Sequence, residues 1–116
     1  MEGAERTRGE VCNFKQPNWR PLERVAEEIA GAFMWMFEVD MENGDRVHAY
    51  KHIDTRCYLH LGVSGTAYAY VDEDDYRVVD LGTLLSEALM DWGAFGATPA
   101  DLEACERIIA RADAGN

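Results

Sequence analysis

The sequence predicts an α+β protein with a five-stranded antiparallel meander sheet, one N-terminal helix and two C-terminal helices. Residues 33–81 contain five short segments in which apolar and polar side chains alternate, as they do in β-strands. Four turn signals rich in Gly, Asn and Asp separate these segments. Apolar residues before and after this run recur at helical spacing, which adds helices on both sides of the sheet.

The N-terminal part is expected to contain a tail and one helix. Residues 1–12 mix Gly, Glu and Arg without a period, so we predict a disordered tail there and a single α+β domain over residues 13–116. Pro21 suits the first turn of a helix, where no backbone N–H is required. This helix should end near Gly31. Its apolar stripe consists of Leu22, Val25 and Ile29.

The turns set the expected pairing of the strands. A two-residue hairpin at Asn43-Gly44 suits residues that tolerate positive φ. It would pair Val39 with His48, Phe37 with Tyr50, and Trp35 with His52. The turn at Asp54-Thr55 would pair Tyr50 with Leu59 and His52 with Cys57, and the turn over 62–65 would pair Leu61 with Thr66 and Leu59 with Tyr68.

These registers divide the sheet into two faces. We take one face as the core and expect the helices mainly on its Trp35/Phe37/Leu59 part. Its members are Phe33, Trp35, Phe37, Val39, His48, Tyr50, His52, Cys57, Leu59, Leu61, Tyr68, Tyr70 and Val79. The opposite face is too apolar for plain solvent exposure, so we expect a helix, a second copy or a partner to cover it. Its members are Met34, Met36, Glu38, Asp40, Val47, Ala49, Lys51, Tyr58, His60, Ala67, Ala69, Val71, Tyr76 and Val78.

Two C-terminal helices complete the predicted fold. Thr83 would cap the first, whose apolar side consists of Leu84, Leu85, Ala88, Leu89 and Trp92. Thr98-Pro99 would begin the second, because threonine is a good cap and proline a good first helical residue. The expected buried stripe of this helix consists of Leu102, Cys105, Ile109 and Ala112.

Charge and composition limit the classes of partner. The chain has 116 residues and a net charge of -11, and residues 72–116, with eleven acidic and three basic side chains, supply -8 of it. Such a charge disfavours nucleic acid and anionic lipid but suits a basic protein partner. No apolar run approaches the roughly 20 residues of a membrane span. The polar start of the chain and an odd number of cysteines predict a cytoplasmic protein without a disulfide framework.

The sequence contains no catalytic or cofactor motif. His52 opposite Cys57 is the sharpest nucleophile candidate, since a nearby base can activate a thiol. A cysteine on a core face is more often a small apolar residue, so we predict no catalytic residue. His48 and His52 lie four residues apart on one strand, about 13 Å at the usual rise, which is too far to share a metal ion. We therefore predict no metal and no cofactor.

Two functions are compatible with these features. The first is a non-enzymatic protein-interaction module that forms a homodimer through Met34, Met36, Tyr58, Ala67 and Ala69. The alternative is a small-molecule-binding protein or small enzyme. Its pocket would lie at the polar-aromatic end of the core face, and its lining residues would be His48, Tyr50, His52, Cys57 and Tyr68.

Overall fold

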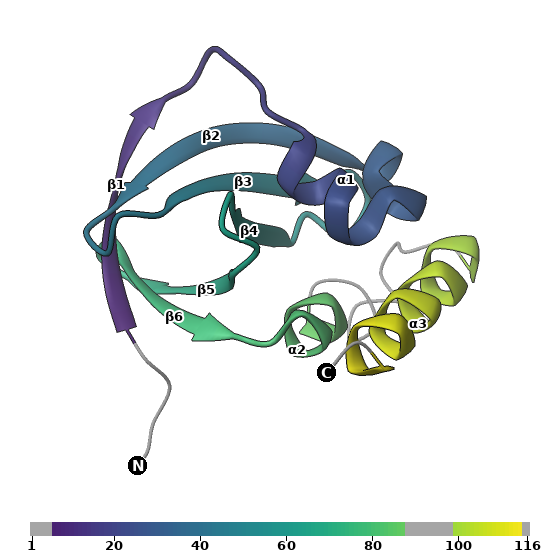
Figure 1. The fold of residues 1–116 in the computed structure, drawn as a ribbon. Helices are drawn as coiled ribbons and strands as arrows, with labels where there is room; N and C mark the ends of the chain where they lie inside the picture. The colour runs from purple at the N-terminus through teal and green to yellow at the C-terminus, as the bar shows by residue number, and fades with distance from the viewer. Residues whose placement is uncertain (1–5, 88–98, 115–116) are drawn as a thin grey trace.

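Six antiparallel strands follow one another in chain order and close into a barrel (Figure 1). The computed structural model describes residues 6–87 and 99–114. The strands are β1 (Arg6–Asn13), β2 (Phe33–Met41), β3 (Arg46–His52), β4 (Tyr58–Gly62), β5 (Ala67–Asp72) and β6 (Asp75–Val79). The predicted open five-stranded meander is therefore wrong, because β1 pairs with both β2 and β6 and joins the two edges of the sheet.

Strand β1 includes residues 6–12, which the sequence assigned to a disordered tail. Its side chains alternate between the inside and the outside of the barrel. Thr7 and Gly9 are buried and Val11 is half-buried, whereas Arg6, Arg8, Glu10 and Cys12 are exposed. The inward residues are small, so the strand lacks the large apolar side chains that mark a strand in sequence. Residues 1–5 lie outside the described residues.

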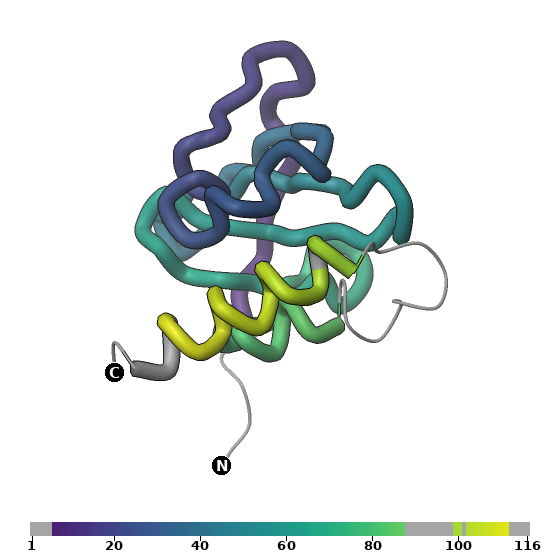
Figure 2. Tube along the Cα trace, turned by 90° about the vertical axis from the view of Figure 1, so that its right-hand side faces the viewer, coloured from purple at the N-terminus to yellow at the C-terminus, as the bar shows by residue number. Residues whose placement is uncertain are grey.

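The helices lie together on one side of the barrel (Figure 1). They are α1 (Arg20–Ala26), the 3-10 helix η1 (Glu27–Ala32), α2 (Leu81–Leu85) and α3 (Pro99–Ala114). Figure 2 looks from that side, with α3 in front and α2 beside it. Arg111 of α3 forms two hydrogen bonds, at 2.9 and 3.1 Å, with the carboxylate of Glu28 in η1. Among the helices of residues 6–87 and 99–114, none has the length and apolar character needed to cross a membrane.

The N-cap of α2 differs from the prediction. Asp80 is the cap, and its carboxylate accepts hydrogen bonds from the backbone N–H and the hydroxyl of Thr83, both at 2.8 Å. The predicted cap, Thr83, lies inside the helix because aspartate three residues earlier already satisfies its N–H. Ala88, Leu89, Trp92 and Thr98, which we assigned to the two C-terminal helices, lie outside the described residues.

Two apolar clusters occupy the two sides of the barrel wall. The helix-side cluster lies between the wall and the helices, and its fully buried members include Leu22, Tyr50, Leu59, Leu85 and Cys105. The interior cluster fills the barrel and consists of Val39, Met41, Val47, Tyr68 and Tyr76, with Val11, Phe37 and Val78 packed against it. Both sides of the same strands are therefore buried over much of their length.

Two hairpins have three-residue loops, which changes the register that we predicted. Met41 pairs with Asp45 across one loop, and Gly62 pairs with Thr66 across the other. The last residue of each loop, Gly44 or Gly65, has a φ of +93° or +96°, which glycine adopts without strain. We had predicted a two-residue loop in the first hairpin and a four-residue loop in the second, and a three-residue loop shifts the pairing of the strands by one residue. Val39 therefore pairs with Val47 instead of His48, and Leu61 pairs with Ala67 instead of Thr66.

A bulge at Met36 changes the faces of β2. Before it, Trp35 pairs with Tyr50, and both belong to the helix side as predicted. After it, Phe37 pairs with Ala49 and points into the barrel. The prediction that Phe37 and Val39 share a face with Trp35 is therefore wrong, because the extra residue reverses the alternation. The pairing of Tyr50 with Leu59 is confirmed.

The apolar part of the predicted second face turns out to be the inside of the barrel. Val47, Tyr76 and Val78 belong to the interior cluster, and Ala49 pairs with both Phe37 and His60. Tyr68, which we placed with the core face, also points inside. Closure of the sheet therefore supplies the cover that we had expected from a helix, a copy or a partner.

We predict that Gly9→Ala destabilises the fold by about 1–3 kcal/mol, because a Cβ at this position meets packed interior side chains. It would lie 2.5 Å from Met41 Sδ, 2.5 Å from Val39 Cγ1 and 3.3 Å from Tyr76 Cε1. Gly31→Ala is the matched control, since no atom of the described residues lies within 4 Å of its Cβ position, and it should change stability by no more than about 0.5 kcal/mol. Urea unfolding measures both, and equal midpoints for the two variants would contradict this packing at Gly9.

Candidate functional site

One end of the barrel interior is closed by a polar network. The Tyr68 hydroxyl donates to Asp45 Oδ2 at 2.7 Å and accepts from Asn43 Nδ2 at 3.2 Å. Ser64 Oγ donates to the same Asp45 oxygen at 2.6 Å. These residues come from the β2–β3 and β4–β5 turns and from the start of β5. The network satisfies the buried phenol and fixes the two turns against each other.

Toward the opposite ends of β4 and β5, the interior opens into a pocket of about 390 Å³. We call it the aromatic pocket. Its lining residues are Val11, Phe37, Tyr58, His60, Tyr70, Asp74 and Tyr76. They come from β1, β2, β4, β5, β6 and the β5–β6 turn. The pocket therefore exists only because the barrel is closed.

Aromatic rings form most of the wall of this pocket. The His60 ring stacks on Tyr58, with centroids 5.7 Å apart and an interplanar angle of 13°, and lies 6.4 Å from Tyr70 at 29°. Tyr76 stands edge-on to both His60 and Tyr70, at 5.3 and 5.4 Å. Phe37 lies 6.2 Å from Tyr58. Near-parallel and near-perpendicular rings together give the pocket aromatic walls in more than one direction.

His60 is the buried polar group of the pocket. Its residue is 6% exposed, and within the described part of the chain no group forms a hydrogen bond with its imidazole. Burial lowers the pKa of His60 to about 4, so the ring is neutral at pH 7. A neutral imidazole has one N–H donor and one acceptor nitrogen. Both are left for a bound molecule or water.

The rim of the pocket carries a carboxylate. Asp74 occupies the tight β5–β6 turn with a φ of +67°, a conformation that aspartate tolerates better than most residues. Among the described residues its side chain is in no ion pair. Burial, together with the charges of Tyr70 and Asp74, raises the pKa of Tyr76 to about 12, so this phenol stays protonated at neutral pH.

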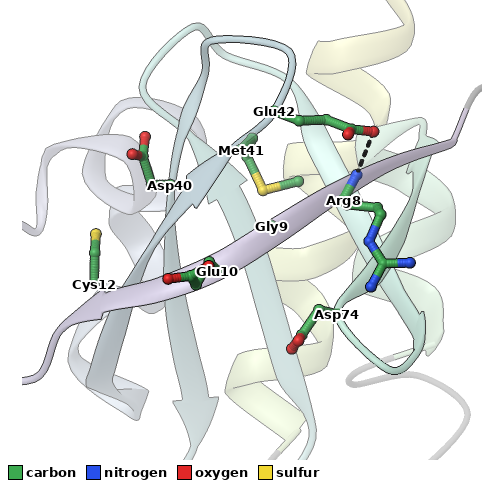
Figure 3. A pocket seen from close by; sticks show the side chains of 8 residues that line it. All are labelled: Arg8, Gly9, Glu10, Cys12, Asp40, Met41, Glu42 and Asp74. Carbon is green, nitrogen blue, oxygen red and sulfur yellow. Dashed lines mark hydrogen bonds between the residues drawn. The ribbon is translucent and has the colours of Figure 1, made fainter.

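Asp74 also lines a second hollow, on the outer side of β1 and β2. This acidic hollow has a volume of about 390 Å³ and is shown in Figure 3. Its lining residues are Arg8, Gly9, Glu10, Cys12, Asp40, Met41, Glu42 and Asp74. Glu42 accepts a hydrogen bond from the Arg8 backbone N–H at 3.0 Å. Four carboxylates line this hollow, yet the described residues contain no group of His, Cys, Asp and Glu that could hold a metal ion.

The predicted ligand-binding residues do not share one cavity. Tyr50 and His52 are fully buried on the helix side, where the Tyr50 hydroxyl donates to the Asn18 carbonyl at 2.6 Å. His48 lies on the same outer side, and its Nδ1 accepts from Trp35 Nε1–H at 2.9 Å. Burial lowers the pKa of His48, although the nearby Glu38 opposes this. Tyr68 lies inside the barrel, in the polar network described above.

His52 and Cys57 are neighbours in the hairpin, but the imidazole is directed to the turn. His52 Nδ1 accepts from the backbone N–H groups of Asp54 and Thr55, at 3.1 and 3.0 Å. Cys57 Sγ donates to the Thr55 carbonyl at 3.7 Å. The pair therefore stabilises the β3–β4 turn. Cys57 also lines a smaller pocket of about 210 Å³ that shares Tyr58, His60 and Tyr70 with the aromatic pocket.

The five residues of the predicted dimer face are divided among different environments. Ala67 is 5% exposed in the helix-side cluster, and Met34 is 41% exposed. Tyr58 and Ala69 line the smaller pocket. Met36 is the half-buried bulge residue of β2. The homodimer stays a prediction, but these five residues do not form a single surface for it.

From the sequence, Tyr58 and His60 are only members of the second face, and no pocket is predicted there. The missed signal was the excess of aromatic residues on a face that should have been polar: Tyr58, His60 and Tyr76. A closed barrel explains such a face, because its inner surface is as buried as its outer one.

The chain has no match among protein-family models, curated proteins or solved structures.

We predict that His60 makes the stability of the protein depend on pH. Because its folded pKa of about 4 is below the ordinary value of 6.5, the unfolded chain binds more protons between these two pH values. Stability should therefore fall as the pH drops from 6.5 to 4, by an amount on the order of 3 kcal/mol. Urea unfolding at intervals of pH would measure this.

His60→Phe is the control for this prediction, because it keeps a ring in the stack and removes the titration. Carboxylates with a lowered pKa, such as Glu28, lose stabilising interactions at lower pH in both proteins, so the difference between the two curves isolates His60. Parallel curves over this pH window would show that His60 is not desolvated.

We predict that His52→Phe lowers stability by about 1–3 kcal/mol, because two turn N–H groups lose their acceptor. The phenyl ring can keep the edge-to-face contact with Phe33, whose centroid lies 5.0 Å from that of His52. Chemical unfolding measures the loss. An unchanged midpoint would mean that the imidazole does not hold the turn.

Proposed function

We propose that this protein is a non-enzymatic small-molecule-binding protein, and that the aromatic pocket is its binding site. The observation that carries the proposal is His60, a buried imidazole without a protein hydrogen-bond partner among the described residues, in the wall of an aromatic pocket. A ring nitrogen in the pocket wall that no described protein group engages can form a hydrogen bond with a molecule that occupies the pocket.

Size and lining support this proposal. The volume of about 390 Å³ lies in the range of roughly 300–1,000 Å³ that is typical of small-molecule sites. Such sites combine an apolar or aromatic wall with a few polar groups. Here the polar groups are the imidazole, the tyrosine hydroxyls and Asp74. Among the described residues, the lining contains no Ser, Thr, Cys or Lys, although Cys57 lines the adjoining smaller pocket.

We also propose that the protein acts in the cytoplasm. Cys12, Cys57 and Cys105 are free thiols, and Cys12 is exposed, which suits a reducing compartment. A basic protein partner remains a prediction, which the acidic hollow would accommodate by charge.

Ligand screening by NMR tests the proposed binding site. The chain has three histidines, so the ring signals of His60 can be followed separately in a ¹H–¹³C spectrum. We expect members of a small aromatic and aliphatic fragment library to shift His60, while His48 and His52, which lie outside the barrel, move little. Val11→Trp should reduce this binding at least about tenfold, because the indole would occupy the pocket.

Val63→Trp is the matched control. Val63 is 45% exposed on the β4–β5 turn and does not line the aromatic pocket. If no fragment shifts His60, or if Val63→Trp reduces binding as much as Val11→Trp does, the pocket is not a binding site.

A further inference from the structure

We infer that the ligand of the aromatic pocket is a protonated organic amine, held between the tyrosine rings with Asp74 as its counter-ion. This inference rests on the proposed function, since it names the chemical class that the pocket selects.

The aromatic wall suits a cation. The face of a phenol or phenyl ring attracts an ammonium group within about 6 Å of its centroid, and the attraction grows when water is excluded. Tyr58, Tyr70 and Tyr76 line the pocket in more than one orientation. The chain itself gives an example of the contact, because Lys51 Nζ lies 5.7 Å from the centroid of the Tyr58 ring.

The polar groups of the pocket fit an ammonium that carries an N–H. His60 has an acceptor nitrogen and adds no positive charge at neutral pH. Asp74 supplies a carboxylate that is in no ion pair among the described residues. In the described part of the chain no Lys or Arg lines the pocket, so an anionic ligand would find no cationic partner among these residues.

The surroundings of the pocket are mainly acidic, although Arg8 lines the neighbouring hollow and Lys51 lies near Tyr58. Asp74 links the aromatic pocket to the acidic hollow, whose other carboxylates are Glu10, Asp40 and Glu42. With a net charge of -11, the whole chain attracts cations and repels anions. A neutral ring compound would use the aromatic wall but would gain nothing from this charge.

Two probe molecules of the same shape, one charged and one neutral, separate the contribution of charge to binding from that of shape. N,N-dimethylethanolamine is a cation at pH 7, and 3-methyl-1-butanol replaces its N–H by C–H and is neutral. Binding of each is measured from the His60 ring shifts at low ionic strength. We expect the amine to bind about tenfold more tightly than the alcohol, and added salt to reduce this ratio.

Substitutions in the β5–β6 turn and at Lys51 test whether the carboxylate of Asp74 is the counter-ion of the amine. Asp74→Asn removes the carboxylate and keeps a residue that tolerates positive φ, so we expect a several-fold loss of amine affinity with alcohol affinity unchanged. Glu73→Gln removes an equal charge from the neighbouring exposed residue, which does not line the pocket, and should have little effect. Lys51→Met should strengthen amine binding, because it removes a repelling ammonium near Tyr58.

If Asp74→Asn does not fold, Tyr70→Leu replaces it, since Tyr70 is 52% exposed and contributes little to the core. This variant should weaken the amine more than the alcohol. Equal binding of the two probes, or equal effects of Asp74→Asn and Glu73→Gln, would overturn the amine assignment and leave the pocket intact. Failure of every neutral fragment as well as both probes to shift His60 would overturn the proposed function itself.

Discussion

Closure of the barrel by β1 is the contact on which the rest of this structure depends. The strand forms hydrogen-bonded ladders with β2 and β6, which would otherwise be the exposed edges of an open sheet. It can approach both only because Gly9 has no side chain where Met41, Val39 and Tyr76 pack. The same strand supplies Val11 to the aromatic pocket. Without β1, the interior cluster would be a solvated face and the pocket would lack a wall.

The sequence predicted the local elements better than their assembly. Alternation and turn residues located the strands that became β2 to β6, and Pro21 located the start of α1. Three details with almost no sequence signal decided the assembly: the three-residue loops, the bulge at Met36, and the small inward residues of β1. Each of these loops, and the bulge, shifts the strand pairing by one residue. Because neighbouring side chains of a strand point to opposite faces, such a shift moves a residue from the inside of the barrel to the outside.

The same one-residue shifts explain why the predicted ligand-binding residues do not line the aromatic pocket. The sequence indicated an excess of polar aromatic residues, and it placed them on the face that contains Tyr50 and Tyr68. In the structure Tyr50 is on the helix side and Tyr68 closes the far end of the interior. The aromatic pocket is lined instead by residues such as Tyr58, His60 and Tyr76, which we had placed on the second face. When both faces of a sheet are buried, outer and inner residues are equally apolar. Composition then does not indicate which residues point into the barrel.

Polar groups at the two ends of the barrel interior are stabilised in different ways. At the Tyr68 end, the phenol and Asp45 satisfy each other and pack two turns together, so nothing is left for a ligand. At the His60 end, the imidazole has aromatic neighbours and, among the described residues, no hydrogen-bond partner. Burial at such a position lowers the pKa of a histidine, so the ring is neutral and no ion-pair partner is required. The neutral ring thus keeps an acceptor nitrogen in the wall of a pocket that Asp74 also lines, and the proposed ammonium ligand would donate to both groups.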